Sequence, residues 1–213
     1  MKVTLKLATS LDGRIATAGG ESRWISGPEA RGEVHRLRLA HEAILVGVGT
    51  VLADDPELTV RLDPPPARQP VRVVMDSRQR IPQGCRLVAG AGAHRTIVLT
   101  TQAPAPRLSK AGVTVIQAAE RKGRVDPRAA LEALERVGVQ ALMIEGGGEV
   151  AASFLLAGLV DALEWFRAPI LLGAEGRPAV GALALDALAS APRFRRLSAQ
   201  AVGEDLWERY ERG

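Results

Sequence analysis

The stretch ALMIEGGGEVAASFLLAG, at residues 141–158, carries the strongest structural signal in the chain. Its first four residues are apolar and predict a buried strand. After the glycines, Val150, Phe154 and Ala157 share one face of a predicted helix, which ends at Gly158. A strand that turns through glycines into a helix is typical of α/β proteins with a parallel sheet.

The glycine turn itself, Gly146, Gly147 and Gly148, favours an anion site. Glycine lets a ligand approach the backbone closely, and the N–H groups at the start of the new helix attract a diphosphate. The alternative is a tight turn that needs glycine for steric reasons alone. The turn lacks the GxGxxG pattern and lies near the last third of the chain, which disfavours a standard N-terminal Rossmann domain.

Short apolar runs alternate with helical patterns along the rest of the chain, without an internal repeat or a long linker. Pro28 opens one predicted helix, and Asp126 caps another that extends to about residue 137. The pattern predicts one domain, residues 1–213, with a mostly parallel central sheet and helices on both faces. The predicted strands cover residues 3–8, 43–48, 71–75, 96–99, 113–116, 141–144, 163–168 and 206–210.

Composition is that of an ordinary globular protein, with 46% hydrophobic and 24% charged residues and a net charge of +4. The chain has 24 arginines and four lysines. The planar guanidinium of arginine binds oxyanions such as phosphate well, although a genomic bias explains the same count. Because the basic residues are spread along the chain, a nucleic-acid-binding tail is disfavoured.

One cysteine, Cys85, excludes a disulfide within the chain and suits a reducing cytoplasm. The three histidines, His35, His41 and His94, lack metal-ligand spacing, so we expect no metal site. We see no signal peptide and no membrane-spanning run at the start of the chain. The expected location is the cytoplasm, without a membrane partner.

Further candidate site residues precede the helix at Pro28 and follow the strand at 43–48. Ser22 and Trp24 lie before a helix start, where Trp24 either stacks on a flat ring or plugs the edge of the core. In TVLADDPELTVR, residues 50–61, the acidic pair is either a solvated turn or part of a site. Arg61 either holds a phosphate or lies on the surface as an isolated charge.

Polar residues also follow two predicted parallel strands. Ser77 and Arg78 come after the strand at 71–75, and Thr100 and Thr101 after the next strand. Ligands of open α/β sheets gather at the carboxyl ends of strands, where Arg, Ser or Thr meets the 2′-phosphate of NADPH. These four residues are therefore candidates to contact a cofactor at the strand ends.

Six segments occur in the order LKLATSLDGRIA, GESRWIS, AILVGVGTVLADDPELTVR, VRVVMDSR, IEGGG and LVDALEWFRAPILLG. Together they resemble the reductase domain of the bacterial riboflavin-biosynthesis deaminase/reductase, over nearly the whole chain. The resemblance implies a three-layer, dihydrofolate-reductase-like fold, and a homodimer. It also implies NADPH-dependent reduction of 5-amino-6-(5-phosphoribosylamino)uracil to the ribitylamino product, with hydride transfer to C1′ of an opened imine.

The resemblance also assigns residues by motif. Asp54 and Glu145 are candidate proton donors, as is water. The residues that match the family's substrate contacts are Ser22, Arg38, Leu58, Arg61 and Glu145. Those that match its NADPH contacts are Ala8, Trp24, Thr50, Asp54, Ser77, Gly147, Gly148, Glu149, Val150, Ala151, Ala152 and Ser153.

The chain departs from the bifunctional family at one point. The zinc deaminase that precedes this domain needs an H-x-E motif and a P-C-x-x-C motif, and neither is present. We expect a free-standing reductase or one domain of a longer protein. Three alternatives remain open: reduction of a related diamino-pyrimidinone, reduction of a pterin, and NADPH sensing without catalysis.

Overall fold

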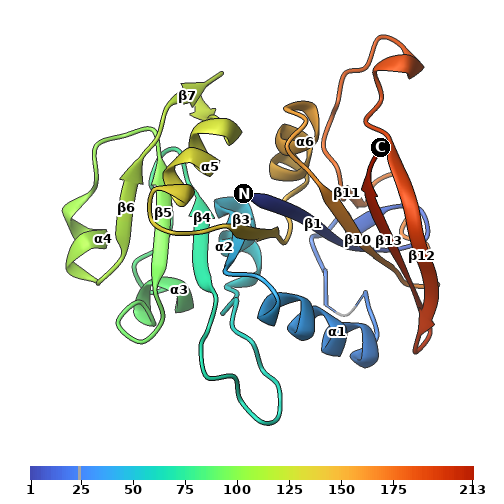
Figure 1. Cartoon of the computed structure of the whole chain (residues 1–213), viewed down its shortest axis with the longest axis horizontal. Coiled ribbons are helices and arrows are strands. Elements are labelled where there is room, and N and C mark those ends of the chain that lie inside the picture. Colours follow the sequence, from blue (N-terminus) through green and yellow to red (C-terminus); the bar gives the residue numbers. More distant parts are fainter. Residues whose placement is uncertain (24) are drawn as a thin grey trace. The chain divides into compact units, whose positions relative to one another are not determined.

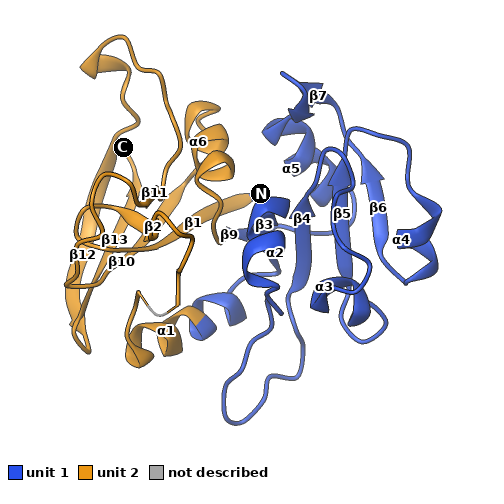
Figure 2. Cartoon of the chain, turned by 180° about the vertical axis from the view of Figure 1, so that it is seen from behind, with its two compact units in different colours: residues 1, 35–143 blue, residues 2–34, 144–213 orange. Residues whose placement is uncertain are grey.

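The computed structural model describes residues 1–23 and 25–213, and Figure 1 shows the course of the chain. Trp24, a predicted cofactor contact, lies outside the described residues. The chain forms two compact units, coloured separately in Figure 2. Unit 1 consists of residue 1 and residues 35–143, and unit 2 of residues 2–34 and 144–213. The expectation of a single reductase domain stays a prediction.

Unit 1 is built on parallel strands in the order β9-β3-β4-β5-β6. Ala43–Gly47 (β3) and Thr96–Thr100 (β5) are buried along their whole length, as expected of strands covered on both faces. The other strands of this sheet are Val71–Met75 (β4), Thr114–Gln117 (β6) and Ala141–Ile144 (β9). Glu120–Arg121 (β7) and Arg124–Val125 (β8) form a separate small antiparallel ribbon.

Three helices of unit 1 pack on a core of Ile, Val and Leu side chains around Ile44, Val74 and Val98: Val48–Asp54 (α2), Arg86–Ala89 (α3) and Pro106–Lys110 (α4). The fourth helix, Pro127–Glu135 (α5), buries Ala130, Ala133 and Leu134. Helix α5 begins where the sequence predicts, because the Asp126 carboxylate caps it by accepting from the Arg128 and Ala129 N–H groups at 2.8 and 3.2 Å.

Unit 2 contains strands in the order β12-β13-β10-β1. Lys2–Thr9 (β1) pairs parallel with Ala162–Arg167 (β10), and β10 pairs antiparallel with Asp205–Arg212 (β13). Phe194–Val202 (β12) completes this set, and Arg14–Ala16 (β2) pairs with Arg177–Pro178 (β11). Gly148–Leu156 (α6) and a 3₁₀ turn at Leu188–Ser190 lie in the same unit. Pro28–Leu39 (α1) begins in unit 2 and ends in unit 1.

All of the predicted strands are present, with small differences at their ends. Several elements were not predicted: helices α2, α3 and α4, the long strand β12, the short strands β2, β7, β8 and β11, and the 3₁₀ turn. Residues 48–54, expected to start as strand and continue as a polar turn, form helix α2. Strand β12 was missed because most of its residues are exposed, so it lacks the alternation of a half-buried strand. No helix in the described part of the chain is long and apolar enough to span a membrane.

Candidate functional site

The glycine turn lies in unit 2 between β9 and α6. Gly146 and Gly147 have φ values of +99° and +86°, which side chains other than glycine's rarely adopt. Gly147 is the N-cap of α6, and no side chain caps this helix. The first turn of α6 therefore offers the uncapped start that phosphate groups bind in other proteins.

Gly148 has a different role. A Cβ atom at Gly148 would lie 2.7 Å from the Pro178 carbonyl oxygen and 3.3 Å from the Gly181 nitrogen. In addition, the Gly181 N–H donates to the Gly148 carbonyl at 2.8 Å. Thus the steric explanation holds for this glycine, because the segment around 178–181 packs against it.

The rest of the predicted cofactor run, residues 149–153, divides into exposed and buried positions. Glu149 is exposed and Val150 half-buried, whereas Ala151 and Ala152 are buried in the core. The Ser153 hydroxyl donates to the Val150 carbonyl at 2.8 Å. The start of α6 is therefore the part of this run that is open to a ligand, while its second turn serves packing.

The segment SLDGRIA, residues 10–16, is joined to the glycine turn through residues that the sequence reasoning missed. The Asp12 carboxylate accepts from the Leu172 and Gly173 N–H groups, at 3.2 and 2.8 Å. Farther along, β2 pairs with β11, and the Ala179 N–H donates to the Gly13 carbonyl at 3.0 Å. Asp12 in a turn was the available signal, but its partners lie 160 residues away in sequence.

Three other predicted contacts belong to unit 2. Ala8 is half-buried in β1, opposite Phe166 of β10. Ser22 is half-buried in the loop before α1, and its carbonyl accepts from Ile25 at 3.3 Å. Glu145 is half-buried directly after β9.

In unit 1, residues 50–61 leave the sheet through α2 and continue as an irregular segment. Thr50 lies in the first turn of α2, and Asp54 is its last residue. Two residues have positive φ values that only glycine adopts easily: +41° at Asp55 and +54° at Leu58. The Leu58 side chain is buried, so its backbone is the part able to contact a ligand.

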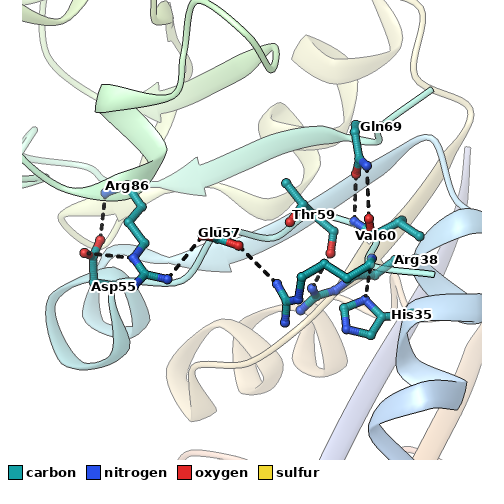
Figure 3. A network of polar contacts seen from close by, with 9 residues as sticks. His35, Arg38, Asp55, Glu57, Thr59, Val60, Gln69 and Arg86 are labelled. Atoms are coloured by element: carbon teal, nitrogen blue, oxygen red, sulfur yellow. Dashed lines mark hydrogen bonds and ion pairs between the residues drawn. The ribbon is translucent and has the colours of Figure 1, made fainter. Parts of the chain in front are cut away.

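The backbone from Thr59 to Arg61 is held by side chains rather than by a neighbouring strand (Figure 3). Arg38 Nη1 donates to the Thr59 carbonyl at 2.8 Å. The Arg61 N–H donates to His35 Nδ1 at 3.1 Å. The structure thereby brings together Arg38 and the segment that carries Leu58 and Arg61. Their role as one substrate site stays a prediction.

Arg61 begins a chain of alternating charges, of which Figure 3 labels Glu57, Arg86 and Asp55. Arg61 Nη1 lies 3.3 Å from one Glu57 oxygen, and Arg86 Nη1 lies 3.3 Å from the other. The Arg86 N–H donates to Asp55 at 2.8 Å. Neither Glu57 nor Arg86 was predicted, because charged residues on a surface segment usually have no partner recognisable from sequence.

At the ends of β4 and β5 the hydroxyl groups bind the protein itself. The Thr100 and Thr101 hydroxyls donate to the Ser77 carbonyl at 3.1 and 2.9 Å. Ser77 Oγ accepts from the Val125 N–H at 2.9 Å. Asp76, fully buried, accepts from Ile81 at 2.7 Å through Oδ2, while Oδ1 has no hydrogen-bond partner among the described residues. This network shapes the strand ends at which Ser77 was predicted to contact the cofactor.

A search for groups of His, Cys, Asp and Glu that could hold a metal ion finds none in residues 1–23 and 25–213. The candidate residues instead form two groups, one in each unit: the glycine turn with its supporting segment in unit 2, and the arginine-bearing segment with the β4 and β5 ends in unit 1.

Comparison with known proteins identifies the family. The model of the RibD C-terminal domain matches residues 1–207. The chain belongs to this family. RibD from Acinetobacter baumannii (form 2) aligns over the whole chain and 58% of its own length, with a TM-score of 0.86 and 29% identity. The expected dihydrofolate-reductase-like α/β fold of this reductase domain is thereby confirmed.

Two curated relatives differ in how much of them the chain covers. The riboflavin biosynthesis protein RibD of Actinobacillus pleuropneumoniae is 36% identical over 208 residues, which are 96% of this chain and 55% of that protein. The chain thus spans about half of this relative's length. The 2,5-diamino-6-ribosylamino-4(3H)-pyrimidinone 5′-phosphate reductase of Methanothermobacter thermautotrophicus is 42% identical over 212 residues, 98% of this chain and 96% of that protein.

Proposed function

We propose that this RibD C-terminal domain protein reduces 5-amino-6-(5-phosphoribosylamino)uracil to the ribitylamino product, with NADPH as the reductant. The observation that carries the substrate half of the proposal is the segment 58–61, whose backbone is held beside Arg38 and which presents Arg61. Two arginines suit a sugar phosphate, because guanidinium groups form paired, charge-assisted hydrogen bonds with its oxygens.

The fit of the cofactor rests on the glycine turn. Positive φ values at Gly146 and Gly147 fit a turn built from glycine, and no side-chain hydrogen bond caps α6, so the backbone N–H groups at the helix start suit an anion. The first turn of α6 would hold the NADPH diphosphate, and Ser77 and Thr50 would contact the rest of the dinucleotide. When bound, NADPH supplies the hydride; the protein orients the reactants and excludes competing reactions.

The other residues of the site bind and orient the substrate. Arg61 and Arg38 bind the phosphate of the substrate, and Glu145 positions its pyrimidine ring. Asp54, Glu145 and water remain the candidates for donating the proton. The proposal also includes a cytoplasmic location and a homodimer, and light scattering of the purified chain tests the homodimer.

A second substrate is supported by a specific observation. The archaeal relative matched over 96% of its length is named as a reductase of the 2,5-diamino-pyrimidinone 5′-phosphate. Both substrates have the same ribosyl phosphate, so the arginine-bearing segment serves either. The two differ in the pyrimidine ring, which Glu145 and the loop at Ser22 would contact.

The test is loss of absorbance at the NADPH band when the purified chain is mixed with each pyrimidine in turn. We expect oxidation with the phosphoribosylaminouracil. If NADPH were oxidised faster with the diamino compound, that compound would be the substrate in place of the phosphoribosylaminouracil. NADPH binding without oxidation in either mixture would show a sensor and overturn the proposed catalysis.

A further inference from the structure

Three consecutive residues of unit 1, Thr59, Val60 and Arg61, have backbone groups bound by side chains from elsewhere in that unit. These residues belong to no helix or strand. Arg38 was already predicted as a substrate contact, and its bond to Thr59 is part of the site described above. Two further side chains, those of His35 and Gln69, have no role assigned by the family motifs.

Gln69 binds Val60 through both ends of its amide. The Val60 N–H donates to Gln69 Oε1 at 2.7 Å, and Gln69 Nε2 donates to the Val60 carbonyl at 3.0 Å. Val60 is buried, so its backbone groups need partners that water does not supply. A carboxamide offers one acceptor and one donor side by side, and here it takes the place of a neighbouring strand.

His35 holds the next residue. Its Nδ1 accepts the Arg61 N–H at 3.1 Å, which requires an imidazole that is unprotonated at Nδ1. Since His35 and Arg38 both belong to α1, one helix face holds the backbone on either side of Val60. Figure 3 shows these side chains converging on the segment.

The opposite end of Arg61 is held much less firmly. Its guanidinium lies 3.3 Å from Glu57, and the two side chains are 59% and 42% exposed. Ion pairs this exposed contribute little, because solvent screens them and both long side chains lose freedom. The backbone therefore fixes only the point from which the Arg61 side chain extends, and His35 and Gln69 hold that backbone together with Arg38.

We propose that His35 and Gln69 are positioning residues that set Arg61 for the phosphate of the substrate. The inference rests on the proposed function, because it assigns that phosphate to Arg61. Neither side chain needs to touch the substrate: each fixes the main chain from which Arg61 extends. A displacement of about 1 Å at such a contact is enough to reduce binding strongly.

The test compares variants that remove or keep each hydrogen bond. His35→Leu and Gln69→Leu should each raise KM for the phosphorylated pyrimidine about tenfold, because a misplaced Arg61 loses much of its charge-assisted contact with the phosphate. The KM for NADPH and kcat should change by less than about twofold. The phosphate contact stabilises the bound substrate and the transition state equally, so its loss affects only substrate binding.

Rescue distinguishes positioning from a general packing role. Asn places Oδ1 where His has Nδ1 and has a similar helix propensity, so His35→Asn should restore KM to within about threefold of the unaltered protein. His35→Gln, with its acceptor one bond farther out, should not. Gln69→Glu keeps the acceptor and loses the donor, and an intermediate KM is expected.

Binding of ribose 5-phosphate, measured by calorimetry, separates failure of this inference from failure of the proposed function. If neither pyrimidine is reduced, the proposed function fails, while weaker ribose 5-phosphate binding in His35→Leu and Gln69→Leu still supports the positioning role. In the two leucine variants, the Val60 and Arg61 amides should also exchange hydrogen faster than in the unaltered protein. Unchanged KM and ribose 5-phosphate affinity in both leucine variants, with Arg61→Ala impaired, would overturn the inference.

Discussion

Gly148 lies so close to Pro178 that a Cβ atom on this glycine would come within 2.7 Å of the Pro178 carbonyl oxygen. Replacing Gly148 by alanine should therefore lower the free energy of unfolding by about 1–3 kcal/mol, the usual cost of overpacking. Denaturation with urea measures the change. Gly32→Ala in α1 is the matched control, because its Cβ would meet nothing within 4 Å, and alanine should stabilise that helix by about 0.5–1 kcal/mol. Unchanged stability in Gly148→Ala together with lost NADPH affinity would instead make Gly148 a ligand contact.

The Asp12 carboxylate should make stability depend on pH in acid. A hydrogen bond from Ser10 and the N–H groups of Leu172 and Gly173 lower the pKa of Asp12 from 3.8 to about 2. A carboxylate with a depressed pKa stabilises the fold above its unfolded value, and this contribution is lost as pH falls from about 4 to about 2. The Tm difference between the unaltered protein and Asp12→Asn should be largest near neutral pH and shrink over that range. A difference that stays constant down to pH 2 would contradict this role.

Arg72 should be important for stability rather than for binding. Its guanidinium, inside unit 1, donates through Nη2 to the Leu87 and His94 carbonyls at 3.0 Å and to Thr96 Oγ1 at 2.6 Å. Desolvation by burial lowers the pKa of Arg72. Arg72→Met should reduce the free energy of unfolding by about 3 kcal/mol, because buried acceptors lose their donor.

The exposed Arg95 provides the control for that experiment. Arg95→Met should cost less than about 0.5 kcal/mol, as substitutions on the surface usually do. Equal losses of stability in the two variants, measured by urea denaturation, would contradict the structural role of Arg72.

Arg61→Ala should impair substrate binding selectively. Loss of one charge-assisted contact costs about 1.5–3 kcal/mol, which corresponds to roughly a 10- to 150-fold increase in KM for the phosphorylated pyrimidine. KM for NADPH should remain nearly unchanged. Arg68→Ala removes another exposed arginine from the same unit and should alter neither constant. An unaltered substrate KM in Arg61→Ala would remove Arg61 from the site.

Most strands and the helix caps could be predicted because their signals are local. Continuous apolar runs identify the buried strands of unit 1, and Asp126 followed by Pro127 identifies the start of α5. Secondary structure was harder to predict where a strand is not a buried apolar run. Strand β12 is mostly exposed, and residues 48–54 have an apolar start that suits a strand as well as a helix.

The candidate residues could be named from motifs, but their partners could not. Arg61 and Arg38 follow from the motifs, whereas Gln69 and His35 show no signal until the chain folds around Val60. In the same way, the three glycines of the turn are equivalent in sequence. Only the approach of the 178–181 segment distinguishes Gly148, which serves packing, from Gly146 and Gly147, whose φ values are positive.

By itself, the sequence determined the α/β architecture, the family and the residue types able to hold a phosphate and a dinucleotide, because periodicity and short motifs are local properties of a chain. Tertiary structure decided which polar groups meet: Asp12 binds Gly173, 161 positions away, and Gln69 binds Val60 across a loop of the same unit. The physical reason is that buried backbone groups must find hydrogen-bond partners, and which side chain provides them depends on packing in three dimensions.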